Sequence, residues 1–172
     1  MVENPPSVLR TLAERIRYAP WAVVNLHLRR PLADRPGAPP SWDNVVYGAA
    51  GLGYVDAQHQ KLDPRPGPTV LSWYCAPGEA ARQSLLLRSW QDWHSAALAE
   101  FAQSHPDLDA ALTRVEVARY GHAMAIPVPG ARERVVNGTP RAGPLVFAHS
   151  DWAGYSIFEE AFTAGHRAGL GI

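Results

Sequence analysis

The sequence predicts an α+β fold with a mainly antiparallel sheet and flanking helices, followed by a short C-terminal strand and helix. Three observations support this fold class. Short segments rich in β-branched and aromatic residues, divided by Gly- and Pro-bearing turns, occupy much of residues 21–76. A long segment with helical spacing of apolar residues separates them from a further strand. The last segment, LVFAHSDWAGYSIFEEAFTAGHRAGLGI, has the strand, Gly-bearing loop and helix of half a nucleotide-binding unit.

The first half of the chain is predicted to contain one helix and four strands. The helix runs from about Ser7, its N-cap, to Tyr18, and Pro20 stops it. The strands are predicted in WAVVNLHL, NVVYG, LGYVDAQ and PTVLSWYCA. Between them, GAAGLG at 48–53 has the order Gly-x-x-Gly-x-Gly and is followed by strand-like sequence. We therefore expect a turn there rather than a dinucleotide-binding loop.

The second half is predicted to open with one long helix, from about Glu79 to Ser104. Its apolar stripe consists of Leu86, Trp90, Trp93, Ala97 and Phe101. Residues 113–121 follow as a strand with one buried face. Asn137-Gly138 predicts a hairpin, which also accounts for the formal glycosylation sequon at Asn137.

The final helix is predicted to begin near Ile157, because Ser156 and Glu159 fit a capping box. One face of this helix combines aromatic and small residues: Phe158, Ala161, Phe162, Gly165, Ala168 and Ile172. A helix N-terminus favours negative charge, but Glu159 and Glu160 already occupy the first turn. A reduced flavin, whose charge is spread over N1 and C2=O, therefore suits this end better than a pyrophosphate does.

Composition and motifs argue against several classes of function. Sixteen basic residues balance sixteen acidic ones and are scattered, so nucleic acid is not an expected partner. Cys75 is the single cysteine, and the seven histidines form no metal-binding motif, so neither a disulfide nor a metal site is predicted. The sequence has neither a signal-peptide pattern nor an apolar run of the ~20 residues that span a membrane, so we expect a cytoplasmic protein without a membrane span.

The closing segment FEEAFTAGHRAG resembles the end of the FAD-dependent amine oxidase and phytoene desaturase superfamily, which typically reads MEGAVEAGERAA. The matching positions are Glu159, Ala161, Ala164, Gly165, Arg167 and Ala168. LVFAHSD resembles the last strand of that family. RYAPWAVVNLHL, SWDNVVYG, LGYVDAQHQ and YGHAMAIPVPG resemble the substrate half of a bacterial branch similar to spermidine dehydrogenase. The resemblance covers roughly Arg17 to Ala168.

This resemblance implies FAD as the cofactor and hydride transfer from a small organic substrate to flavin N5. In the family, an N-terminal Rossmann unit holds FAD, the substrate domain covers the flavin, and the C-terminal strand and helix complete the cofactor site. Asp151, or Ser150 in the neighbouring register, would bind the ribityl chain or phosphates. Backbone N–H groups around Ser156 and Ile157 would face the flavin C2 carbonyl. The implied cofactor-binding set is Ser150, Asp151, Gly154, Tyr155, Ser156 and Ile157.

Four residues are candidates for the substrate pocket by type and position: Trp42, Trp73, Tyr120 and His122. Ordinary core positions are the alternative for the aromatic members, and a buried strand end with a hydrogen-bonded histidine is the alternative for His122. The resemblance leaves the substrate open among polyamines, other amines and conjugated apolar molecules. The aromatic-cage position of the amine oxidases falls on Ile157 instead of a Tyr, unless a longer loop lets Tyr155 take that place.

The sequence contains no Gly-x-Gly-x-x-Gly, so the principal FAD-binding unit of the family is missing from these residues. We therefore predict residues 1–143 as a substrate-binding α+β domain and 144–172 as the strand–loop–helix of an incomplete FAD-binding domain, inactive alone. Two alternatives are one subunit of a split flavoenzyme whose partner chain carries the Rossmann unit, and a non-enzymatic module that binds a ligand or partner.

Overall fold

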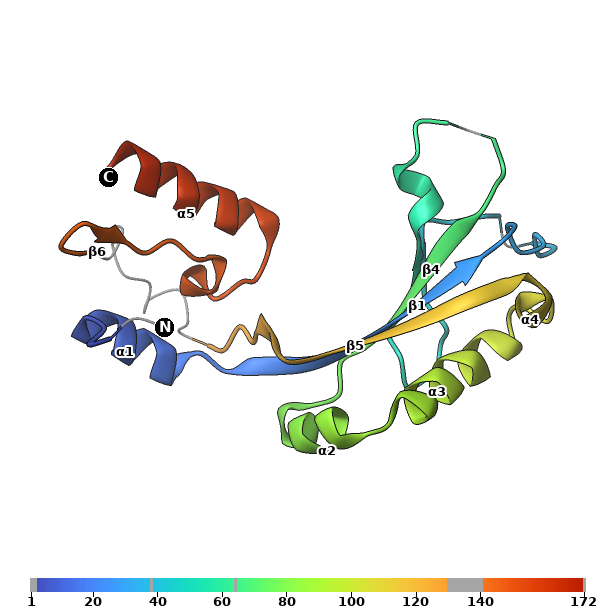
Figure 1. Ribbon diagram of the computed structural model, residues 1–172, viewed down its shortest axis with the longest axis horizontal. Helices are drawn as coiled ribbons and strands as arrows, with labels where there is room; N and C mark the ends of the chain where they lie inside the picture. Colours follow the sequence, from blue (N-terminus) through green and yellow to red (C-terminus); the bar gives the residue numbers. More distant parts are fainter. Residues whose placement is uncertain (1–2, 38, 64, 130–140, 172) are drawn as a thin grey trace. The chain divides into compact units, whose positions relative to one another are not determined.

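The computed structural model describes residues 3–37, 39–63, 65–129 and 141–171. It has the predicted α+β class, with an antiparallel five-stranded sheet in the order β2-β3-β4-β1-β5 and several helices (Figure 1). The chain forms two compact units, one of residues Pro20–Gly121 and one of Met1–Ala19 together with His122–Ile172. The N-terminal helix thus groups with the C-terminal residues, a division different from the predicted boundary after residue 143.

The sheet is built around strand β1 (Tyr18–Leu28). On one side it pairs antiparallel with β4 (Thr69–Cys75), from Ala22 opposite Cys75 to Leu28 opposite Thr69. On its other side lies β5 (Leu112–Ala125). Strand β3 (Gly53–Asp56) pairs with β4, and the two-residue β2 (Asp43–Asn44) forms the edge. The predicted strand in NVVYG is therefore wrong beyond Asn44.

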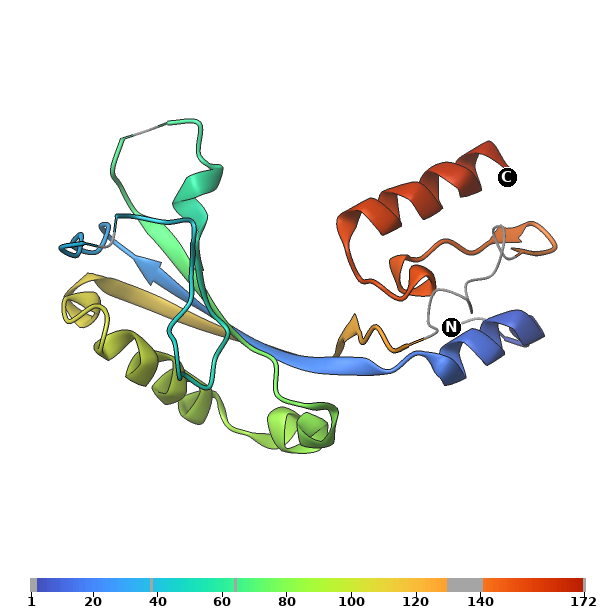
Figure 2. The ribbon, with the colours of Figure 1, turned by 180° about the vertical axis from the view of Figure 1, so that it is seen from behind.

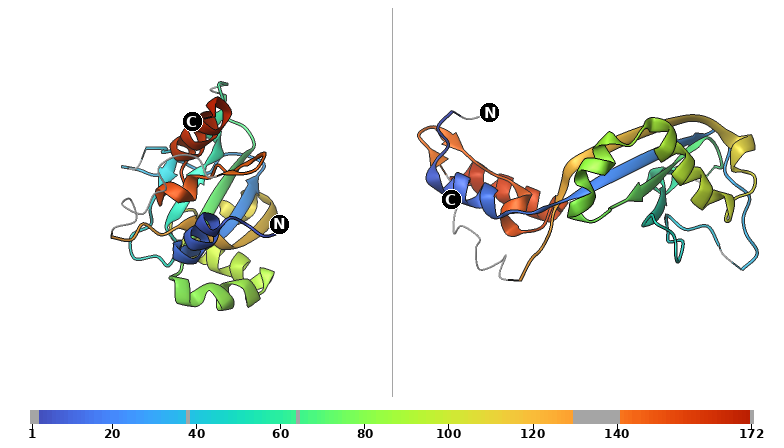
Figure 3. Two further views of the ribbon diagram at one scale, coloured as in Figure 1. Left: turned by 90° about the vertical axis from the view of Figure 1, so that its left-hand side faces the viewer. Right: turned by 90° about the horizontal axis from the view of Figure 1, so that it is seen from below.

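The core of unit 20–121 lies between this sheet and two helices, α2 (Arg82–Leu87) and α3 (Trp90–Ala102), which run along one of its faces (Figures 1 and 3). Alternate residues of the two central strands point into this core: Ala22, Val24, Leu26 and Leu28 from β1, and Leu71, Trp73 and Cys75 from β4. Helix α3 covers them with Trp93, Ala97 and Phe101. Each large apolar side chain buried in this way stabilises the fold by about 1.5–3 kcal/mol.

The long helix predicted over 79–104 is divided in the structure. A 3-10 turn η2 (Glu79–Ala81) and α2 precede a break, after which α3 starts anew. Ser89 causes this break, because its hydroxyl accepts a hydrogen bond from Asp92 N–H at 3.1 Å and caps α3. The break changes the phase of the apolar stripe, so Leu85 is buried while Leu86 and Trp90 are exposed.

The turn before β3 agrees with the prediction for GAAGLG. The sequence GAAGLG lies between β2 and β3, as a turn without a following helix. Its last residue, Gly53, has φ +113° and lies so close to β2 that an added Cβ would be 2.0 Å from Asn44 O. Only glycine fits there. After α3, the short α4 (Leu108–Ala111) leads into β5.

The other unit begins with α1 (Ser7–Arg15). Ser7 is the first residue of this helix and not its N-cap, which is Pro6. The helix ends before Tyr18 because residues 18–20 already belong to β1, so its predicted extension to Tyr18 is wrong. Among the described residues Leu12 is the buried residue of α1.

The C-terminal residues form a hairpin, a 3-10 turn and a helix (Figure 2). The predicted last strand shrinks to β7 (Leu145–Val146), which pairs antiparallel with β6 (Arg141–Ala142). The turn η4 (Ser150–Ala153) and helix α5 (Phe158–Leu170) follow. The predicted hairpin at Asn137-Gly138 lies outside the described residues. In the part of the chain that is described, no helix is long and apolar enough to cross a membrane.

The cap at Ser89 gives a first test of the fold. Ser89→Ala should lower the free energy of unfolding by about 1 kcal/mol, because the first turn of α3 loses its side-chain acceptor. Urea denaturation followed by circular dichroism measures this loss. Ser95→Ala makes the same change at an exposed position inside α3 and should shift stability by less than about 0.5 kcal/mol. Equal effects of the two substitutions would contradict the assigned cap.

Candidate functional site

Asp151 is the centre of a polar cluster in the unit of residues 1–19 and 122–172. Its side chain is buried, with 6% of the residue exposed. Tyr18 donates its hydroxyl to Oδ2 at 2.8 Å, and Ser156 donates to Oδ1 at 2.5 Å. The ring of His149 approaches Oδ2 to 3.3 Å. The carboxylate is thus held by side chains of its own unit, and its predicted contact with the ribityl chain or phosphates stays a prediction.

Ser156 does not form the predicted capping box. Its hydroxyl accepts a hydrogen bond from Ala125 N–H at 2.7 Å while donating to Asp151, so it ties the loop before α5 to the end of β5. Helix α5 begins at Phe158, and its N-cap residue Ile157 makes no side-chain cap. Glu159 lies in the first turn as predicted, but it does not reach back to a serine cap. The first N–H groups of α5 therefore face no capping side chain.

The remaining predicted cofactor residues surround this helix start. Ser150 opens η4, and Gly154 ends it with φ +81°, a left-handed conformation that suits glycine. Tyr155 and Ile157 leave 45% and 44% of their surfaces exposed. The structure thus brings Asp151, Ser156 and the loop 154–157 together just before α5, with two apolar side chains on the outside.

Helix α5 has the predicted apolar face from Phe158 to Ala168, and nothing described covers it. Ile172, which was also predicted on this face, lies outside the described residues. None of the described residues of α5 is buried, and Phe158 and Phe162 are 76% and 64% exposed. At Gly165 and Gly169 on the same side, an added Cβ would meet no atom within 4 Å. Another protein surface could therefore approach the backbone of this face closely.

The sheet face opposite α3 is a second candidate surface, in the unit of residues 20–121. Trp21 stacks on Tyr74 with ring centroids 5.7 Å apart. Further along the same face, where Asn25 pairs with Ser72, the Ser72 hydroxyl donates a hydrogen bond to the Asn25 side chain at 2.7 Å. Next, the His27 ring lies 3.1 Å from Glu116, and this hydrogen bond holds the pKa of the glutamate below its usual value.

Sequence reasoning did not select the residues of this open face. A signal was present, since Trp21, Asn25 and His27 alternate along β1 with fully apolar residues. A strand that alternates in this way places its polar and amphipathic residues on one face. This alternation could have identified the residues of the open face from the sequence alone.

The four predicted substrate residues occupy different environments. Trp73 is 2% exposed, and its indole N–H donates to Glu100 at 2.6 Å, so it takes the alternative role of a core residue. Trp42 and Tyr120 are about half exposed, at 57% and 52%. His122 belongs to the other unit, where its ring meets Tyr18 edge to face at 5.6 Å.

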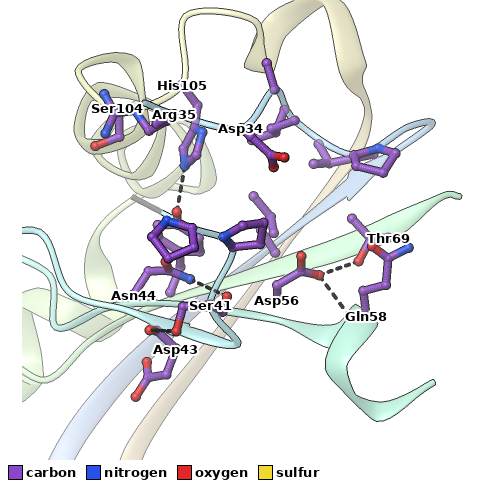
Figure 4. Close-up of a pocket in the computed structure, with 18 of the residues that line it drawn as sticks. Asp34, Arg35, Ser41, Asp43, Asn44, Asp56, Gln58, Thr69, Ser104 and His105 are labelled. Carbon is purple, nitrogen blue, oxygen red and sulfur yellow. Dashed lines mark hydrogen bonds between the residues drawn. The ribbon is translucent and has the colours of Figure 1, made fainter. Parts of the chain in front are cut away.

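A pocket of ≈ 580 Å³ lies in unit 20–121 between β3, β4, the end of α3 and the proline-bearing loop after β1 (Figure 4). Tyr54 OH lies 2.6 Å from His105 Nε2. Burial, followed by the nearby Arg35 charge, lowers the pKa of His105, so its ring is neutral at pH 7. Among the described residues, His105 Nδ1 and Gln58 Nε2 are buried without a hydrogen-bond partner. None of the predicted substrate residues lines this pocket.

Within the described ranges, no three His, Cys, Asp or Glu residues are grouped in a way that could hold a metal ion. The chain matches no protein-family model, and no curated protein matches it in sequence.

Tyr18 provides a test of the Asp151 cluster. Burial, the hydrogen bond to Asp151 and the charge of that carboxylate raise the pKa of Tyr18 from 10.0 to about 12. Because the folded chain holds this proton more tightly, the stabilisation is complete below pH 10 and is lost as the pH rises towards 12. Carbon NMR of labelled tyrosine Cζ should show one ring titrating near pH 12, absent in Tyr18→Phe. A Tyr18 signal that titrates near pH 10 in the folded chain would contradict the buried hydrogen bond.

Proposed function

We propose that this chain is the C-terminal portion of a FAD-dependent oxidoreductase of the flavin amine oxidase and phytoene desaturase superfamily. The reaction is hydride transfer from a small organic substrate to flavin N5. Unit 20–121 supplies the substrate-binding surface, and the loop 154–157 with α5 completes the cofactor site. A Rossmann-type FAD-binding unit, which these 172 residues lack, is needed for activity.

The main support for this proposal is that the apolar face of α5 is exposed. A helix of 13 residues with an apolar face normally buries that face. Here Phe158 and Phe162 are largely exposed, and Gly165 beside them is open to close approach. These features fit a helix that packs on a sheet supplied by the FAD-binding unit.

The start of α5 is suited to a flavin carbonyl. Its N-cap residue offers no side-chain acceptor, so backbone N–H groups near Ile157 and Phe158 are free of a capping side chain. Such groups stabilise negative charge at a carbonyl oxygen. Bound FAD supplies the hydride-accepting N5. Asp151 and Ser156 would act by fixing the loop 154–157, since each is hydrogen-bonded to the other.

The open face of the sheet fits the substrate-binding part. Trp21 and Tyr74 present stacked rings, which exclude water from an apolar part of a substrate. Asn25 and Ser72 lie beside them and offer polar groups that can orient it. Orientation and water exclusion are the contributions that a protein makes to hydride transfer.

A reconstitution experiment tests the proposal. The 172-residue chain is expressed alone and together with a Gly-x-Gly-x-x-Gly-bearing segment encoded beside it in the same genome. We expect no bound flavin with the chain alone and a stoichiometric FAD complex after co-expression, measured by flavin absorbance and gel filtration. Absence of such a coding segment, or a chain pair that forms no flavin complex, would contradict the proposal. Tight FAD binding by the chain alone would contradict the need for the second unit.

Two variants of α5 show whether its apolar face makes the contact. Phe162→Asp places a charge on that face and should weaken the complex at least about 100-fold. Thr163→Asp introduces the same charge at the next position, which is exposed and points about 100° away, and should change affinity by less than about threefold. Equal affinities for the two variants would exclude this face from the interface.

A further inference from the structure

Strand β5 lies at one edge of the five-stranded sheet. In the described part of the chain, β1 is its only strand neighbour. The N–H and C=O groups on the outer side of an edge strand have no partner in the sheet, so a further strand can pair with them. With 14 residues, β5 is also the longest of the described strands. It therefore offers an extended edge for pairing.

The hydrogen bond at the start of β5 indicates which backbone groups point outward. The C=O of Ala111 accepts from Arg29 N–H at 2.9 Å, so it points towards the end of β1. The backbone groups of successive strand residues point to opposite sides of the strand. Those of Val115 therefore point towards β1, and those of Arg114 and Glu116 point away from the sheet.

The side chains of this stretch alternate regularly. Val115 and Val117 pack against the core. Arg114 and Glu116 form an ion pair on the opposite face, where Glu116 also lies 3.1 Å from His27. The side chains of Arg114 and Glu116 are 68% and 41% exposed. A bulge would interrupt this alternation, so the outward backbone groups and the two charges belong to the same pair of residues.

These two residues make the edge complementary to itself. If two copies of β5 pair antiparallel about a two-fold axis at Val115, Arg114 of each copy lies opposite Glu116 of the other. Opposite charges in such positions stabilise antiparallel pairing, and like charges destabilise it. Charged side chains usually protect an edge from pairing, but their order here favours a second copy of the same strand.

We propose that β5 of unit 20–121 pairs with β5 of a second copy of this chain and joins the two sheets into one antiparallel sheet. Arg114 and Glu116 exchange backbone hydrogen bonds across the axis, and their side chains form a group of four alternating charges. Val115 of one copy lies opposite Val115 of the other on the helix-covered face. This contact uses neither α5 nor the stacked rings of the open face, so it is independent of the proposed oxidoreductase activity.

Sedimentation velocity of the 172-residue chain, without flavin, measures this association. Because the paired stretch is short, we expect a monomer–dimer equilibrium with a Kd of about 1–100 µM. Glu116→Arg places like charges opposite each other and should weaken the dimer at least about tenfold. Glu14→Arg makes the same charge reversal at an exposed position of α1 and should change the Kd by less than about threefold.

A charge swap separates pairing from an effect on folding. The double variant Arg114→Glu/Glu116→Arg restores opposite charges across the axis and should return the Kd to within about threefold of the original value. Amide hydrogen exchange gives a second measurement. The N–H groups of Arg114 and Glu116 should gain protection as protein concentration rises, whereas that of Val115 is protected at every concentration.

Three results would overturn the proposal. The first is a chain that stays monomeric up to about 500 µM, which would leave the edge of β5 to a strand of another protein. The second is a folded double variant that dimerises no better than Glu116→Arg. The third is a dimer that persists in Glu116→Arg but is lost in Phe162→Asp, because that dimer would form through α5.

Discussion

The period-two alternation of β1 is the constraint on which unit 20–121 depends. Ala22, Val24 and Leu26 are fully buried, and they pack with the core residues of α3. Because successive side chains of a strand point to opposite faces, this burial sends Trp21 and Asn25 to the other side. A shift of one residue would bury Asn25 and expose Leu26, so the register is strongly specified. The same apolar row therefore fixes both the core and the composition of the open face.

The other unit is held together by different physics. Leu12 and Ala125 are its only buried apolar residues within the described ranges, and the buried carboxylate of Asp151 organises the rest. Tyr18 and Ser156 reach that carboxylate from segments far apart in sequence, and Ser156 also binds the backbone of Ala125. Such a polar network sets geometry well but buries little apolar surface. This unit has a small apolar core because the apolar face of α5 is exposed. A second protein surface packed on that face would increase the apolar area that the unit buries.

The sequence was sufficient where local pattern decides structure. The strands around Val24 and Trp73, the turn before Gly53 and the apolar face of α5 follow from periodicity and turn chemistry, and the structure has them. It was insufficient where two local signals compete or where the partner is distant. The helical stripe continued through Ser89, but a cap at that residue stopped the helix. Ser156 and Glu159 match the sequence pattern of a capping box, yet the Ser156 hydroxyl donates to Asp151 and accepts from Ala125 N–H. The local sequence around Ser156 does not predict the contact with Ala125.

The two candidate surfaces of unit 20–121 differ in chemistry but are connected through one residue of β2, Asp43. Asp43 lines the pocket, and its carboxylate also accepts a hydrogen bond from Tyr74 OH at 3.1 Å. Tyr74 in turn stacks on Trp21 of the open face. The backbone of Asp43 accepts from Ser41 Oγ at 2.9 Å, which ties this residue to the proline-bearing wall. Asp43 is therefore hydrogen-bonded both to the proline-bearing wall and to Tyr74, whose ring belongs to the open face.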